Sequence, residues 1–160
     1  MKDFKYLFAY TVPIAVYISF ISTGLWTFFS VFYVFIIIPL LDLIFGETKE
    51  NLTDEDISYI KNKWIFDLML YLNLPIVFGL LYLILFNINS NVYEVYELVG
   101  LAISSGILLA TNGINVAHEL GHRKSFFDRF LSQTFYIPCL YMHFFIEHNY
   151  GHHLKVATPE

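Results

Sequence analysis

Two histidines in the last third of the chain have a spacing that suits metal binding. His118 and His122 are four residues apart within the run NGINVAHELGHR at 112–123. Residues four apart project from one face of a helix, so both imidazoles could bind one metal ion. Asn115 shares this face one turn earlier. The alternative is a pair of interfacial polar residues, but polar groups at the end of a membrane helix are costly and tend to be functional.

A second histidine cluster follows in EHNYGHH at 147–153. His148 and His152 repeat the spacing of four, whereas the adjacent His153 would point elsewhere and could reach a second metal. Five of the six histidines therefore fall in two compact groups. The sixth, His143, precedes His148 by five residues and is off its helix face, so we expect it to pack nearby or to support a ligand.

The ligand type narrows the choice of metal. Imidazole suits zinc, copper, iron and nickel, and a structural tetrahedral zinc site needs four ligands that usually include cysteine. The single cysteine, Cys139, lies outside both clusters. Five clustered histidines exceed what one tetrahedral ion uses, which favours two metals. Two ions held mostly by neutral imidazole keep a high positive charge, as suits a pair of irons that activate dioxygen.

The two clusters carry a family resemblance. HELGHR at 118–123, then EHNYGHH at 147–153 and VATPE, resemble the first two histidine boxes of the membrane-bound alkane 1-monooxygenases, within the fatty acid desaturase and hydroxylase superfamily. IPLLDLIFGE at 38–47 and NGINVAHELGH at 112–122 are also similar to that family. The resemblance implies a centre of two non-haem iron ions that hydroxylates the terminal methyl of alkanes, with dioxygen and with electrons delivered by rubredoxin.

The resemblance also implies roles for single residues. The implied iron ligands are His118, His122, His148, His152 and His153. Glu119 and Glu147 would be outer carboxylates that orient the imidazoles. The family has further histidine motifs and spanning helices beyond those matched here. We therefore expect 1–160 to be a single membrane domain, the N-terminal part of a longer desaturase-like domain, which holds roughly half of the metal site and is inactive alone.

Two other functions remain open. The H-E-x-x-H pattern is typical of zinc proteases, in which Glu119 would be the general base of an intramembrane metalloprotease. A noncatalytic membrane protein could instead capture metal with the same histidines. Metal content separates the three hypotheses: two irons for the oxygenase, one zinc for the protease, and an exchangeable mixture for the carrier.

The composition predicts that membrane helices position these residues. Of the 160 residues, 57% are hydrophobic and 14% are charged, against about 45–50% and about 25% in soluble domains. The net charge of -5 and the lack of a basic patch weigh against nucleic-acid binding. A spanning helix needs about 20 apolar residues. Four stretches meet or approach that length: 6–22, 25–45, 64–86 and 95–117.

These stretches predict an all-α, polytopic transmembrane helical bundle of four spanning helices with a fifth apolar segment at 130–146. A simple fifth span would place the two histidine clusters on opposite faces of the lipid bilayer. We therefore expect 130–146 to be interfacial or re-entrant and broken near Pro138.

The basic residues predict an orientation. All nine Lys and Arg residues lie before the first helix, between helices two and three, or after helix four. The positive-inside rule makes that side cytoplasmic. We therefore expect a multi-pass protein with its N-terminus and both histidine clusters on the cytoplasmic side, and the family resemblance implies a bacterial inner membrane.

Four acidic residues lie near the expected helix ends. Asp42 and Asp67 are at the cytoplasmic ends of helices two and three. Each could accept a hydrogen bond from a ligating histidine or reach water instead. Glu94 and Glu97 are at the opposite end of helix four, where we expect both to be solvated.

Overall fold

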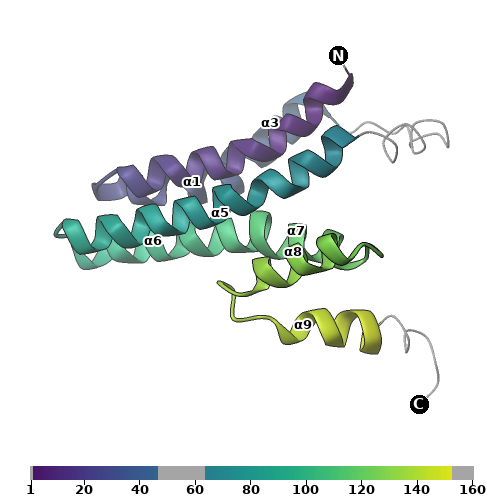
Figure 1. Ribbon diagram of the computed structural model, residues 1–160. Helices are drawn as coiled ribbons and strands as arrows, with labels where there is room; N and C mark the ends of the chain where they lie inside the picture. Colours follow the sequence, from purple (N-terminus) through teal and green to yellow (C-terminus); the bar gives the residue numbers. More distant parts are fainter. Residues whose placement is uncertain (1, 47–63, 153–160) are drawn as a thin grey trace. The chain divides into compact units, whose positions relative to one another are not determined.

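The computed structural model describes residues 2–46 and 64–152, and all the regular secondary structure in these ranges is helical (Figure 1). The chain divides into two compact units, Met1–Leu108 and Leu109–Glu160. The expectation of an all-α protein is confirmed.

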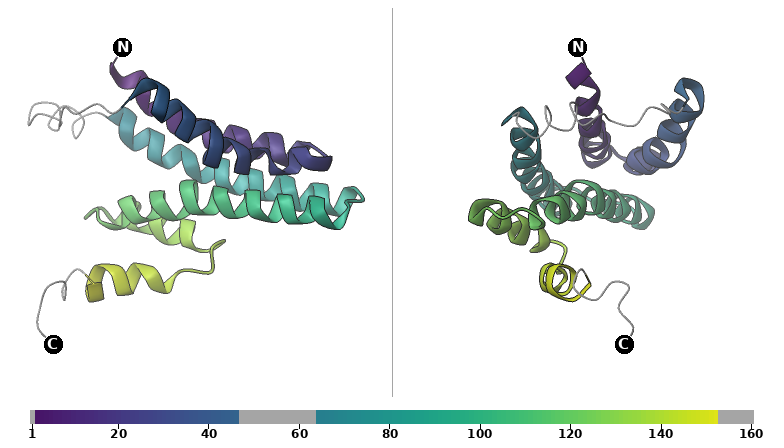
Figure 2. Two further views of the ribbon diagram at one scale, coloured as in Figure 1. Left: turned by 180° about the vertical axis from the view of Figure 1, so that it is seen from behind. Right: turned by 90° about the vertical axis from the view of Figure 1, so that its right-hand side faces the viewer.

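The first unit is built from long apolar helical segments. Its elements are η1 (Lys2–Tyr10), α1 (Thr11–Ile21), η2 (Gly24–Phe28), α2 (Phe29–Phe32), η3 (Tyr33–Ile37), α3 (Ile38–Phe45), α5 (Trp64–Ser90) and α6 (Val95–Leu108). Here η1 and η2 are 3-10 helices and η3 is a π-helix. Pro39 has no N–H to donate to the carbonyl of Phe35, which accounts for the wider turn just before it. Figure 2 shows α1 between α5 and the segment from α2 to α3.

Within the described part of the chain, three helices are long and apolar enough to cross a membrane: Gly24–Phe45, Trp64–Ser90 and Val95–Gly121. They correspond to the second, third and fourth expected spans. The first expected span is a shorter apolar helix, Tyr6–Ile21, which is about 26 Å long with about 2.0 Å per residue in its 3-10 part and about 1.5 Å in α1, less than the bilayer core of about 30 Å. The structure thus supports three full-length candidates rather than four.

A buried polar seam joins three helical segments of the first unit. Ser19, Thr27, Ser30 and Ser104 are all fully buried. The Ser30 hydroxyl donates to Ser104 Oγ (2.8 Å), and the Ser104 hydroxyl donates to the carbonyl of Thr27 (2.9 Å). The backbone N–H of Ser30 donates to Ser19 Oγ (2.9 Å). Such hydrogen bonds between small residues are typical of close helix packing in membranes.

Glu97 was expected to be solvated, and that prediction is wrong. Its side chain is only 7% exposed. One carboxylate oxygen accepts the N–H of Glu94 (2.7 Å) and the other accepts the N–H of Gly24. Nearby in the sequence, the Asn87 amide donates to the carbonyl of Phe20 (2.9 Å). The Glu97 carboxylate thus ties the first turn of α6 to the start of η2, and the Asn87 bond ties the end of α5 to the end of α1.

The second unit consists of short helices. They are η4 (Leu109–Ile114) and α7 (Asn115–Gly121), then α8 (Phe126–Tyr136), α9 (His143–Ile146) and η5 (Glu147–His152), with η4 and η5 being π-helices. The α7 and α8 helices pack closely, and the Ser132 hydroxyl donates to the carbonyl of Ala117 (2.6 Å). Leu120, Phe135 and Tyr136 are almost completely buried in this unit.

A tight turn breaks the apolar segment 130–146, as expected near Pro138. The N–H of Tyr141 donates to the carbonyl of Tyr136 (3.1 Å), and the N–H of Leu140 donates to the carbonyl of Ile137 (3.0 Å). This pair of bonds is the Schellman motif that ends many helices. Its left-handed position, usually glycine, is Leu140 with φ 53°. At about 16 Å, α8 is too short to cross a bilayer.

Candidate metal centre

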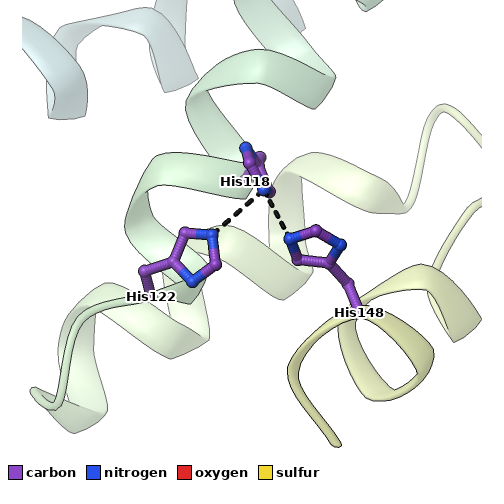
Figure 3. Close-up of side chains that lie close together, drawn as sticks. All are labelled: His118, His122 and His148. Atoms are coloured by element: carbon purple, nitrogen blue, oxygen red, sulfur yellow. Dashed lines mark hydrogen bonds between the residues drawn. The ribbon is translucent and has the colours of Figure 1, made fainter. Parts of the chain in front are cut away.

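Three histidines from two separate segments converge within the second unit (Figure 3). His118 lies on α7, His122 is the first residue after α7, and His148 lies on η5. The Nε2 atom of His118 is 2.6 Å from Nε2 of His148 and 3.0 Å from Nε2 of His122. His118 and His148 are half-buried and His122 is exposed. The expected pairing of His118 with His122, and the joining of both to the second cluster, are therefore seen in the structure.

The chemistry of this donor set fits a cation. Two nitrogen lone pairs at such short distances repel unless a proton or a metal ion lies between them. An imidazole nitrogen lies about 2.1 Å from a bound zinc ion, so two nitrogens in a tetrahedral arrangement around one ion would be about 3.4 Å apart. Both separations are shorter than this, so the rings would move apart slightly to hold an ion. Ligation through Nε2 requires each neutral imidazole to carry its proton on Nδ1.

The ring planes also suit a shared ion. The ring of His118 is inclined at 73° to His122 and at 69° to His148, with centroid separations of 4.6 and 4.4 Å. The rings therefore meet edge to face rather than stacking, and their Nε2 edges are turned toward one another. All three donor atoms lie within 4.8 Å of one another.

The remaining histidines have different places. His152 ends η5, and the placement of its side chain is not described; His153 lies outside the described residues. Their proposed ligation therefore stays a prediction. His143 begins α9, is exposed, and packs edge to face against Tyr141 at 4.8 Å, in keeping with a packing role.

The predicted supporting residues are divided between the two units. Glu119 and Asn115 are exposed on α7, and Glu147 is exposed at the start of η5. Asp42, exposed on α3, and Asp67, half-buried on α5, belong to the first unit. Their roles in orienting imidazoles stay predictions.

Sequence reasoning missed the aromatic surroundings of the cluster. The ring of Phe144 stacks on His148 with centroids 4.8 Å apart and planes at 16°, and it meets His118 at 6.1 Å. Tyr141 stacks on Phe144 at 5.0 Å and 19°. Residues 141, 144 and 148 are three and four apart, a spacing that would place them on one face of a regular α-helix. This spacing could have predicted the stacked rings. It begins within the segment 130–146, which the sequence analysis interprets only as apolar.

Two buried groups beside these aromatics stay neutral. Burial, with smaller contributions from Cys139 and Tyr141, raises the pKa of Tyr136 to about 12. Burial also raises the pKa of the Cys139 thiol, which donates to the carbonyl of Phe135 at 3.6 Å. Both groups are protonated at neutral pH, so neither offers an anionic ligand there.

The fold and site together define a class: an all-helical chain with three candidate membrane spans and a histidine cluster compatible with metal binding. No protein-family profile matches the chain. It is 38% identical over 125 residues to alkane 1-monooxygenase of Pseudomonas putida and 36% identical over 125 residues to alkane 1-monooxygenase 1 of Alcanivorax borkumensis. It is 37% identical over 124 residues to alkane 1-monooxygenase of Ectopseudomonas oleovorans.

These alignments cover 76–77% of this chain, and the chain spans 30% of the length of each of these three relatives. The relatives are, by name, oxidoreductases. The resemblance to alkane 1-monooxygenases that the two histidine clusters indicated is thereby confirmed: the matched part of the chain is homologous to a part of these enzymes.

Proposed function

We propose that this chain supplies part of the histidine-ligated diiron centre of a membrane alkane monooxygenase. The main support for this proposal is that three Nε2 atoms, from His118, His122 and His148, converge in a chain homologous to alkane 1-monooxygenases. The substrates in this proposal are an alkane or a similar apolar compound and dioxygen, and the electron donor is rubredoxin. When bound, the iron would supply the oxygen chemistry that converts the terminal C–H bond into an alcohol.

The residues of the chain hold and shape the site. His118, His122 and His148 present neutral Nε2 donors, and we assign His152 and His153 as further ligands. The carboxylates of Glu119 and Glu147 would orient imidazoles from outside the ligand set. We assign the same supporting role to Asn115, His143, Asp42 and Asp67. The ring of Phe144 packs against His148 and His118.

We further propose one membrane domain for 1–160, forming the N-terminal part of a longer desaturase-like domain. The support is that the curated relatives extend well beyond the part matched here. The distribution of Lys and Arg favours an orientation with the N-terminus and histidines on the cytoplasmic side, and the bacterial sources of the relatives favour a bacterial inner membrane.

Metal analysis of the intact protein, purified from membranes, tests the proposal. The expected result is iron near two per protein, and His148→Ala should lower both the iron content and the hydroxylation of alkanes. Gln133→Ala is the control, because Gln133 is an exposed polar residue of α8 in the same unit and has no role in the proposed site; it should retain the iron.

The rival hypotheses give different results in the same measurement. One tightly bound zinc, with Glu119→Ala inactive yet still loaded with zinc, would instead support a metalloprotease. A loosely exchangeable mixture of metals in place of two irons, lowered by His148→Ala, would contradict the oxygenase and favour a metal carrier.

A further inference from the structure

An aromatic ladder runs along one face of the helical segment that contains His148. It is defined by the rings of Tyr141, Phe144 and His148, which stack in succession with interplanar angles of 19° and 16°. Tyr141 precedes α9, Phe144 lies on α9 and His148 lies on η5, so the ladder crosses the start of α9 and the change from α9 to η5. The ladder begins directly after the Schellman turn, in which Leu140 holds a left-handed backbone conformation.

Phe144 is in contact with both histidine-bearing segments. Its ring stacks flat on His148 of η5 and approaches His118 of α7 at 6.1 Å and 60°. It also packs against the fully buried Tyr136 of α8, with centroids 5.7 Å apart. Phe144 is thereby held by α8 while it faces two candidate ligands.

The imidazole of His148 turns freely about its Cβ–Cγ bond unless a neighbour restricts it. A parallel ring at 4.8 Å restricts it, because rotation of the imidazole would either collide with Phe144 or lose the stacking contact. In the observed orientation, Nε2 of His148 faces Nε2 of His118 at 2.6 Å.

We propose that Phe144 is a positioning residue: its ring fixes the plane of His148 so that Nε2 points at the shared metal position, and Tyr141 supports Phe144 by stacking on its ring. This inference rests on the proposed function, because it assigns the metal to the same three histidines. Phe144 itself offers no donor atom to the metal, and its effect acts through the ligand.

Binding of Co²⁺ to the intact, metal-depleted protein tests the proposal. The affinity is measured by competition with a chelator, and the ligand-field spectrum reports the arrangement of the ligands. Phe144→Leu should weaken Co²⁺ binding about tenfold and change the spectrum, as loss of an outer partner typically does. Phe144→Tyr keeps the stacked ring and should restore both. Phe126→Leu is the matched control, since the Phe126 ring is 86% exposed, and it should bind as the wild type does.

The outcomes separate the two proposals. Wild-type affinity in Phe144→Leu would overturn the positioning role, and so would an equal loss in Phe144→Tyr, because that pattern indicates bulk packing instead. If Phe144→Leu does not fold, Phe144→Met removes the ring while keeping a long apolar side chain and gives the same comparison. Failure of the wild type to bind Co²⁺ would refute the proposed metal centre, and the positioning role would fall with it.

Discussion

The hydroxyl of Ser132 on α8 donates a hydrogen bond to the carbonyl of Ala117 on α7 at 2.6 Å. Both residues are fully buried. Ala117 immediately precedes His118, so this single bond ties α8 to the turn that carries the first candidate ligand. The contact connects the packing of the second unit with the geometry of its histidines.

Replacing Ser132 by alanine should lower the free energy of unfolding by about 1 kcal/mol, the net contribution of one buried hydrogen bond. Thermal unfolding of the intact protein in detergent measures the change. Ser105→Ala is the matched control, because the Ser105 hydroxyl bonds only within its own helix, to the carbonyl of Leu101 (2.8 Å). Equal losses in the two variants would contradict a special contribution of the bond between α7 and α8.

Gly121 lies opposite the same serine. A Cβ added at Gly121 would meet Ser132 Oγ at 3.1 Å and the ring of Phe145 at 3.5 Å. Gly121→Ala should therefore cost about 1–3 kcal/mol through overpacking. In a Ser132→Ala background the hydroxyl is absent, so the same substitution should cost at least about 0.5 kcal/mol less. Strictly additive effects in this double-mutant cycle would show that the two side chains do not compete for space.

Gly100 on α6 allows the close approach of η2 in the first unit. A Cβ there would come within 2.8 Å of the Phe28 ring and still closer to the Thr27 hydroxyl. Gly100→Ala should lower the free energy of unfolding by about 1–3 kcal/mol. Gly106 on the same helix has open space around it, so Gly106→Ala should be neutral or slightly stabilising. Chemical unfolding of the two variants under identical conditions provides the comparison.

Leu140 is an apolar residue in a conformation that glycine adopts more readily. Its φ of 53° costs about 1–2 kcal/mol for a residue with a Cβ, and its side chain is 88% exposed. Leu140→Gly should therefore stabilise the protein by up to about 1 kcal/mol after the greater chain entropy of glycine is subtracted.

The control for this prediction is Ile137→Gly in the same turn, where φ is -56°. That substitution gains no relief of strain and should destabilise the protein by about 0.5–1 kcal/mol. The melting temperatures of the two variants, each compared with that of the wild type, test this prediction. A Leu140→Gly variant as unstable as Ile137→Gly would mean that the turn derives its stability from the leucine side chain.

Local patterns were sufficient for some features of the fold and site. Long apolar runs predicted the helices at Gly24–Phe45, Trp64–Ser90 and Val95–Gly121, because length and composition decide which segments can cross a bilayer. The spacing of four predicted that His118 and His122 share a helix face. The requirement that two histidine clusters meet predicted a break near Pro138, where the chain turns between α8 and α9.

Other features depend on neighbours that are distant in the sequence. The burial of Glu97 arises because its carboxylate accepts the N–H of Gly24, 73 residues earlier. The seam that joins Ser19, Ser30 and Ser104 likewise requires three helices to be packed before the hydroxyls can meet. The π-helical turns of η4 and η5 do not follow the 3.6-residue period of an α-helix. A prediction from hydrophobic periodicity therefore cannot detect them.

The separation of the candidate ligands along the chain has a consequence for proteolysis. His118 and His148 are 30 residues apart in sequence, so an ion held between them would close a long loop much as a cross-link does. Loop closure of this kind restricts the unfolded chain, and a ligand that binds only the folded state adds stability by mass action. Chelation should therefore make the segment from α9 through η5 the earliest site of cleavage by an added protease, while the hairpin of α7 and α8 stays protected.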